Sequence, residues 1–168
     1  MTEFAEAVDI VLSEEGGFVN DPIDPGGATN FGISLKLYKD IKKDATVDDI
    51  KKLTKDMAIE IYKKTFWDPN QYEKIMDQRI ANKVFSMCVL MGPIAANRCL
   101  QRALYAVQAD VVIDGKIGPK TLYAVNISQP LQLLAALKSE SAGQLRITIL
   151  LNQKLEKYIE GWLRRAYS

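Results

Sequence analysis

The 168-residue chain contains no histidine. This absence excludes Ser-His-Asp triads, HExxH zinc sites and the His-containing zinc site of the nucleobase deaminases. Any acid–base chemistry must therefore use carboxylates, lysine, tyrosine, cysteine or a bound water. We accordingly expect neither a metal nor a cofactor.

Cysteine and long hydrophobic runs are also scarce. The two cysteines, Cys88 and Cys99, lie in apolar, helix-like sequence, which favours reduced core thiols over a disulfide or a reactive role. No apolar run approaches the ~18–20 residues that a membrane-spanning helix needs. We therefore expect no stable membrane insertion.

Basic residues are absent from the first 33 positions, which hold seven acidic residues, while the remainder holds all 22 Lys and Arg against 14 Asp and Glu. A secretory signal needs a basic segment before its apolar stretch, so none is expected. An acidic opening argues against contact of this segment with nucleic acid. The division fits an anionic or sugar substrate on a basic body, although solvated helix faces are the alternative explanation.

Most of the chain shows helical periodicity, which predicts a mostly α fold. Apolar residues at helical spacing predict a first helix over residues 3–14. Ser34, Thr46 and Thr54 each precede such a pattern and are predicted helix caps. After Pro130 the apolar pattern predicts a helix that runs nearly to the end of the chain, with Gly143 as its weak point.

Residues 16–33 differ from the rest, because they hold five of the ten glycines and two of the six prolines. No helix is expected there. Short extended pieces around residues 18–19 and 31–33, joined by Asp-Pro and Gly-Gly turns, predict a small hairpin or irregular flap.

Glu15 lies at or just beyond the end of the first predicted helix. A carboxyl there faces the negative end of the helix dipole, and shielding by Phe18 and Phe31 would raise its pKa further. A glutamic acid with a raised pKa is the usual general acid for cleaving a glycosidic bond. An exposed glutamate at a helix end is the alternative.

Other polar residues of this run are candidate partners of Glu15. Asp21 or Asp24 would hold a water or stabilise positive charge on the sugar, unless both only start turns. Thr29 and Asn30 would orient a nucleophilic water, with a turn role as the alternative. Residues expected to contact the substrate are Gly16, Gly17, Asn20, Asp21, Gly26 and Gly27.

The run EEGGFVNDPIDPGGATNFGIS, residues 14–34, strongly resembles the signature of glycoside hydrolase family 108, lysozyme-like N-acetylmuramidases of phages and bacteria. The later stretches GPIAANRCLQRAL, DGKIGPKTLYAV and EGWLRRA resemble the predicted peptidoglycan-binding region that accompanies it. The resemblance implies a lysozyme-like helical catalytic region over residues 1–92, with a small β element near its start. A helical peptidoglycan-binding-like region, residues 93–168, would pack with it into one unit.

The resemblance also implies a function. The family's catalytic glutamate, directly before Gly-Gly, matches Glu15, and the substrate would be peptidoglycan glycan strands, cut at the β-1,4 bond between N-acetylmuramic acid and N-acetylglucosamine. In a second group of phage lysozymes, the catalytic Glu is followed by an Asp nine residues later and a Thr fifteen residues later. Counted from Glu15, these positions are Asp24 and Asn30 here, and Thr29, one residue earlier, is the alternative to Asn30. Such family members have also been labelled secretion activators.

Three positions depart from the family pattern. Glu14 stands where the family usually has His, and two adjacent carboxylates repel, which would raise the pKa of either. Ser86 and Leu90 stand where polar Asp and Asn are usual. These departures support an alternative, a catalytically degenerate peptidoglycan-binding or secretion-accessory protein. Without a signal peptide, we expect synthesis in the cytoplasm and action on the cell wall after release through a holin or an exporter.

Overall fold

The computed structural model describes residues 2–14, 16–20 and 26–168. Its helices and strands are α1 (Phe4–Glu14), β1 (Thr29–Asn30), β2 (Ile33–Ser34), α2 (Leu35–Ile41), α3 (Val47–Lys51), α4 (Lys55–Tyr62), the π-helix η1 (Lys63–Trp67), the 3-10 helix η2 (Tyr72–Lys74), α5 (Gln78–Met91), α6 (Pro93–Ala106), α7 (Pro119–Ile127), α8 (Pro130–Leu151), the 3-10 helix η3 (Gln153–Tyr158) and α9 (Ile159–Tyr167). The predicted fold class, mostly α and lysozyme-like with a small β element near the N-terminus, is confirmed.

The small β element is an antiparallel hairpin in which β1 pairs with β2. Its turn consists of Phe31 and Gly32, which have φ angles of 50° and 73°. Two successive positive φ angles match the twist of a tight hairpin, and glycine adopts such an angle without steric cost. Val19 adds an isolated bridge to Thr29, and Tyr62 Oη donates a 2.9 Å hydrogen bond to the Phe31 carbonyl. The predicted hairpin therefore forms and is tied to α4.

Helix starts in the N-terminal half follow the predicted caps. Ser34 accepts a hydrogen bond from the Leu37 amide at 3.2 Å, and Thr54 accepts one from the Met57 amide at 3.3 Å. Thr46 and Asp49 form a reciprocal capping box. Each cap satisfies a main-chain N–H that has no partner within the helix, which is why these short helices begin where they do.

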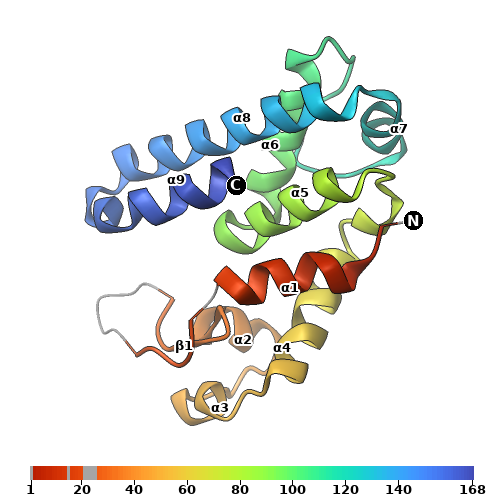
Figure 1. The fold of residues 1–168 in the computed structure, drawn as a ribbon. Coiled ribbons are helices and arrows are strands. Elements are labelled where there is room, and N and C mark those ends of the chain that lie inside the picture. The colour runs from red at the N-terminus through yellow and green to blue at the C-terminus, as the bar shows by residue number, and fades with distance from the viewer. Residues whose placement is uncertain (1, 15, 21–25) are drawn as a thin grey trace.

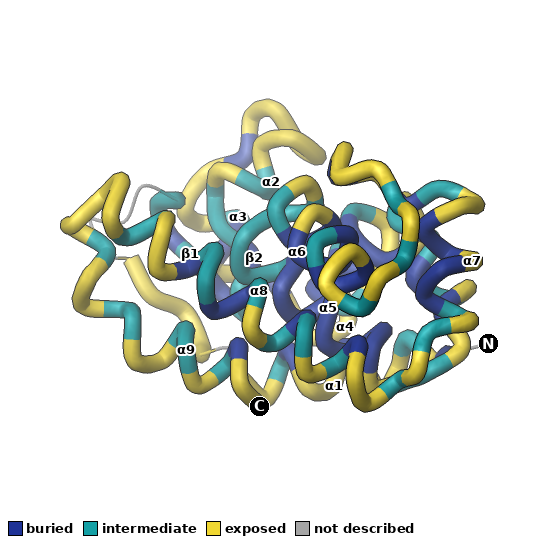
Figure 2. Tube along the Cα trace, turned by 90° about the horizontal axis from the view of Figure 1, so that it is seen from above, coloured by how far each residue is buried: buried dark blue, intermediate teal, exposed yellow. Residues whose placement is uncertain are grey.

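Helix α5 lies at the centre of the molecule, with α1 on one side and α6 and α8 on the other (Figure 1). Every residue from Ile80 to Cys88 is buried, and the buried segments converge around this helix (Figure 2). Aromatic rings of Phe4, Trp67 and Phe85 pack against one another with centroids 5.4–5.8 Å apart. One hydrophobic core thus runs through helices from both halves of the chain.

The cysteines belong to this core. Cys88 and Cys99 are buried and free, as predicted for reduced core thiols. Burial raises the pKa of Cys88 to about 12 and that of Cys99 to about 11. Neither thiol is therefore reactive at neutral pH.

The end of the chain differs from the sequence-based expectation. Helix α8 runs through Gly143 without a break and ends at Leu151, and the chain then reverses at Asn152 and η3. Helix α9 returns alongside α8 toward the middle of the molecule (Figure 1). The expectation of one helix that runs nearly to the end of the chain is wrong, because the chain leaves the helical conformation at Asn152; α8 passes Gly143 because a single glycine inside a packed helix costs only about 1 kcal/mol.

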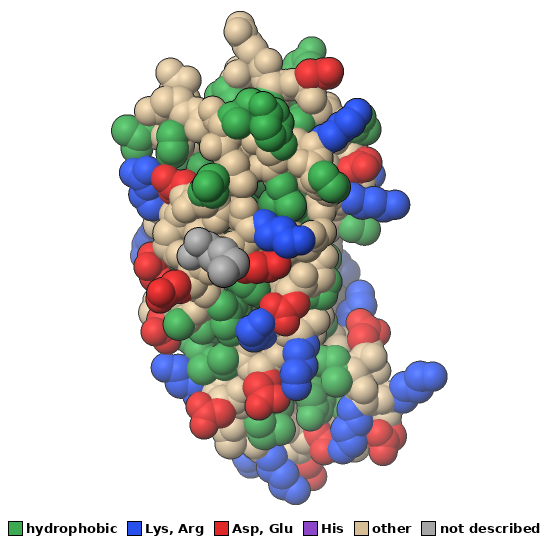
Figure 3. Space-filling view, turned by 90° about the vertical axis from the view of Figure 1, so that its right-hand side faces the viewer, with side chains coloured by type: hydrophobic (Ala, Val, Ile, Leu, Met, Phe, Trp, Pro, Cys, Tyr) green, Lys and Arg blue, Asp and Glu red, His purple; other side chains and the backbone are tan. Residues whose placement is uncertain are grey.

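The surface carries charges of both signs. On the face shown in Figure 3, hydrophobic side chains gather in the upper part, while acidic and basic side chains intermingle below. The charge division of the sequence therefore does not produce a face of one sign there. Across the described parts of the chain, no helix combines the length and the apolar character needed to cross a membrane.

Candidate functional site

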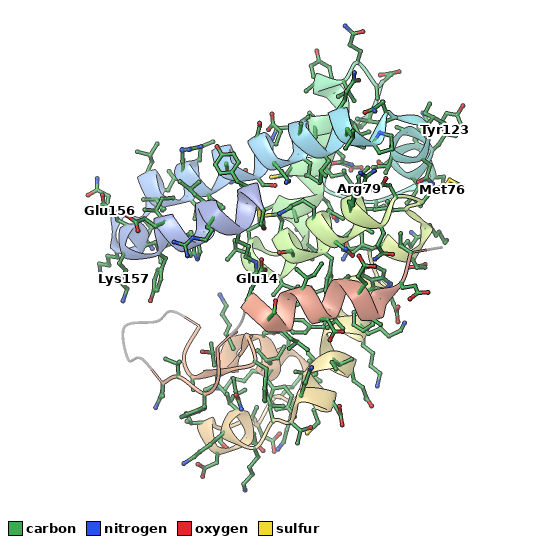
Figure 4. All side chains as sticks on the ribbon, in the orientation of Figure 1. Glu14, Met76, Arg79, Tyr123, Glu156 and Lys157 are labelled. Carbon is green, nitrogen blue, oxygen red and sulfur yellow. The ribbon has the colours of Figure 1, made fainter. Side chains whose placement is uncertain are left out.

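The end of α1 meets α9 in a compact polar contact. Glu14, the last residue of α1, places Oε2 2.8 Å from Nε of Arg165 in α9. Ser86 of α5 lies between them: its hydroxyl donates to Glu14 Oε2 at 3.2 Å and accepts from Arg165 Nε at 3.0 Å. Arg165 also donates to the main-chain carbonyl of Ser86 at 3.2 Å. Figure 4 shows Glu14 between α1 and α9.

This contact accounts for two of the departures from the family signature. The sequence suggested that Glu14 and Glu15 repel each other, but the Glu14 carboxylate has a cationic partner that is only 10% exposed. Ser86 contributes a hydroxyl that serves both members of the ion pair. Glu14, Ser86 and Arg165 thus form one network that joins the two halves of the chain, and we call it the Glu14 network.

A groove of about 530 Å³ opens beside the Glu14 network. Its lining comes from the ends of α1 and α5 and from α9, and consists of Glu14, Leu90, Gly161, Trp162, Arg164, Arg165 and Ser168. Leu90, the third departure, gives this groove an apolar surface. The groove therefore combines a carboxylate, two guanidinium groups and an indole ring, which suits a ligand with both polar and apolar faces.

A second cavity, of about 390 Å³, is also lined by Glu14 and lies between α1, α5 and α8. Lys83 lies on its α5 wall, and Nζ donates to the Arg165 carbonyl at 2.8 Å and to Ser168 Oγ at 3.3 Å. Burial, together with the nearby cations Lys138 and Arg165, lowers the pKa of Lys83 to about 8, although Glu14 opposes this shift. The Lys83 ammonium group thus binds the last turn of α9, although burial and the nearby cations disfavour its charged form.

Several predicted catalytic and substrate-binding residues lie outside the described residues, namely Glu15, Asp21 and Asp24. In sequence, Glu15 directly follows the last residue of α1. Their predicted roles therefore stay predictions.

The predicted glycine and asparagine contacts divide into two groups. Gly16 and Gly17 are exposed and line a pocket of about 280 Å³ together with Phe31 and Lys55. Asn20 is also exposed. Gly26 and Gly27 are half-buried where the chain approaches α2; the Gly26 carbonyl accepts a hydrogen bond from the Lys36 amide at 3.1 Å, and Gly27 lies against the Leu35 side chain.

Thr29 and Asn30 form β1. The Thr29 main chain exchanges two 2.8 Å hydrogen bonds with Val19. Asn30 is 6% exposed, and its amide nitrogen donates to the carbonyls of Ile50 and Leu53 at 3.1 and 3.4 Å. These bonds fix the hairpin to α3, so any water oriented by Asn30 would have to bind its side-chain oxygen. The water-orienting role of either residue stays a prediction.

Sequence reasoning missed the contribution of α9. In the sequence, Trp162 belongs to the apolar pattern after Pro130, and all of Trp162, Arg164 and Arg165 belong to the stretch EGWLRRA, but nothing local indicates that they approach Glu14. In the residues that the structure describes, no three His, Cys, Asp or Glu side chains converge as a metal site requires.

Comparison with known proteins assigns both halves of the chain. Residues 8–92 match the family model described as Glycosyl hydrolase 108, and residues 95–167 match the model described as Predicted Peptidoglycan domain. A search of curated proteins gave no match. The structure of Brucella abortus SagA resembles this one with a TM-score of 0.82 and 30% sequence identity, over 97% of this chain and 88% of that chain.

The matches to the two family models span nearly the whole chain, and the structural likeness covers both regions together. They support a hydrolase or binder of peptidoglycan in the bacterial cell wall, of the glycoside hydrolase class. The chain belongs to glycosyl hydrolase family 108.

Proposed function

We propose that the protein is an N-acetylmuramidase that cleaves the β-1,4 bond between N-acetylmuramic acid and N-acetylglucosamine, with Glu15 as the general acid. The single observation that supports this most is the groove at the end of α1, because Glu15 is the next residue in the sequence and carries the family's motif before Gly16-Gly17. A lysozyme-type hydrolase needs such an acid beside a groove that holds a glycan.

The proposed chemistry requires two carboxyl groups in different states. Glu15 would protonate the leaving glycosidic oxygen, and a carboxyl at the C-terminal end of a helix resists ionisation because the helix dipole is negative there. Asp24 would remain ionised and either activate a water or stabilise the positive charge that develops on the sugar. Thr29 or Asn30 would orient that water.

The test compares two adjacent carboxylates. Clearing of a bacterial cell-wall suspension should fall at least ~100-fold for Glu15→Gln, the usual scale for losing a general acid. Glu14→Gln is the matched comparison and should lose much less activity than Glu15→Gln, because its amide oxygen can still accept from Arg165. Equal clearing by wild type and Glu15→Gln would remove Glu15 from the acid role. Reducing ends on muramic acid, and not on glucosamine, identify the bond that is cut.

A second candidate function is that of a peptidoglycan-binding or secretion-accessory protein without catalysis. Ser86 and Leu90 favour it, because Ser86 is engaged in the Glu14 network and Leu90 gives the groove an apolar surface where the family usually has polar residues. Sedimentation with cell walls without release of reducing sugars would support this alternative and exclude the first.

We also propose that the protein reaches the wall after release from the cytoplasm through a holin or a dedicated exporter, as a phage endolysin or a secretion activator would. Such a route predicts a holin or exporter gene beside its own. Cell fractionation with and without that gene would test the proposal.

A further inference from the structure

Two aromatic rings lie next to each other where η3 passes into α9. Tyr158 and Trp162 are four residues apart, one helical turn, and their rings are stacked with centroids 5.8 Å apart and planes 17° from parallel. Lys157 places its ammonium group 4.8 Å from the Tyr158 ring centroid. The pair is half-buried, so it is neither a core cluster nor a fully solvated one.

Trp162 lines the same groove as Glu14. Part of its indole packs against the hydrophobic core, and another part faces the groove, where Leu90 adds apolar surface and Arg164 adds a donor. A planar ring beside hydrogen-bonding groups matches a pyranose, which has one face of C–H groups and a rim of hydroxyl and N-acetyl groups. A purely apolar ligand would make no use of Arg164, the exposed guanidinium that lines the groove.

We propose that Trp162, supported by Tyr158, is a stacking platform for an N-acetylhexosamine ring of the glycan strand. Helix α9 then forms the wall of the glycan groove across from the end of α1, and the peptidoglycan-binding region completes the catalytic groove. This inference rests on the proposed function, because it names a substrate subsite in the same groove.

Tryptophan fluorescence tests the platform directly. The chain has two tryptophans, and Trp67 is 1% exposed in the core, so a ligand-induced change in emission reports on Trp162. Titration of the Glu15→Gln protein with tri-N-acetylchitotriose should give a saturable change in intensity or wavelength. Trp162→Phe, which leaves Trp67 as the reporter, should abolish that change. An absent change in the Glu15→Gln protein, or a full change in Trp162→Phe, would overturn the proposal.

A second measurement separates binding from folding. Trp162→Ala should weaken trisaccharide binding in calorimetry and raise the apparent KM for cell walls about three- to tenfold, the scale of an aromatic stacking contact, with little change in kcat. Tyr123→Ala is the matched control, because Tyr123 is 67% exposed on α7 at the opposite end of the molecule from Lys157 (Figure 4). Circular dichroism establishes that both variants are folded.

These experiments distinguish failure of the stacking proposal from failure of the proposed catalytic function. Binding by the Glu15→Gln protein does not depend on turnover, so a platform at Trp162 stands even if that protein still cleaves cell walls. Conversely, loss of cleavage in Glu15→Gln together with unchanged binding in Trp162→Ala supports Glu15 as the general acid and excludes Trp162 as a stacking platform.

Discussion

Replacing Arg165 by alanine removes the guanidinium group from the Glu14 network. The side chain of Arg165 is 10% exposed and that of Glu14 is 25% exposed, so the pair lies between a surface ion pair, worth about 0–1 kcal/mol, and a fully buried one, whose disruption costs about 3–5 kcal/mol. The substitution also removes the bonds to the Ser86 hydroxyl and carbonyl. We expect a loss of about 2 kcal/mol in the free energy of unfolding.

For a chain of this length, about 2 kcal/mol lowers the melting temperature by roughly 4–8 °C. Thermal and urea unfolding followed by circular dichroism measure both quantities. Arg164→Ala is the matched control, because it makes the same change one residue earlier, at an exposed position of α9. Arg165→Lys keeps the charge but loses the second donor, so it should recover part of the stability.

A double-mutant cycle isolates the ion pair itself. Glu14→Ala and Arg165→Ala together should cost less than the sum of the two single losses, with a coupling energy of about 1–2 kcal/mol. If Arg165→Ala is no more destabilising than Arg164→Ala, or if the cycle shows no coupling, the network does not hold α9 against α1 and the reasoning is refuted.

Two further predictions concern the C-terminal half. Gly115 has φ 81°, and a Cβ there would lie 3.0 Å from the Ile94 side chain, so Gly115→Ala should lose about 1–3 kcal/mol in urea unfolding while Gly118→Ala, with open space around it, loses much less. The folded pKa of Lys83 is lowered to about 8 from an ordinary 10.5, so at this group the unfolded chain binds more protons between these values, and Lys83 adds a rising slope to the free energy of unfolding from about pH 8 to 10, opposite in sign to the slope that the raised pKa values of Cys88 and Cys99 add above pH 9. Lys83→Met should remove that slope in chemical denaturation, and equal slopes in the two proteins would contradict it.

Local features of this fold could be predicted from the sequence because their physics is local. A cap involves residues three apart, as Thr46 and Asp49 show, and the Phe31-Gly32 turn follows from glycine and proline content nearby. The small hairpin and the helix starts could therefore be predicted from the sequence alone.

The reversal of the chain at Asn152 could not be predicted from such local features. Gly143 was the more conspicuous weak point, yet packing of α8 against α5 and α6 outweighs its small intrinsic cost. Only this reversal returns α9 to the middle of the molecule and brings Arg165 to Glu14, a contact across about 150 positions that periodicity cannot encode. The motif around Glu15 could therefore be recognised in the sequence, and its acid role stays a prediction, whereas the wall of the groove that α9 forms could not be predicted.

The departures from the family signature acquire a different meaning in the structure. Taken singly, Glu14 adds a repelling carboxylate, and Ser86 has an uncharged hydroxyl where the family usually has an aspartate carboxylate. Taken with Arg165, they form one ion pair with a shared hydroxyl, in which each residue satisfies the polar groups of the others.

The same network bears on how the two regions of the chain work together. Glu14 and Leu90 come from residues 1–92, and Trp162 and Arg165 from residues 93–168, yet all four line one groove above one continuous core. Residues 1–92 without α9 would lose one wall of this groove and would leave Glu14 without the cation that compensates it. If the groove holds glycan as we propose, residues 93–168 supply the second half of that site and are not a separate anchor to the wall.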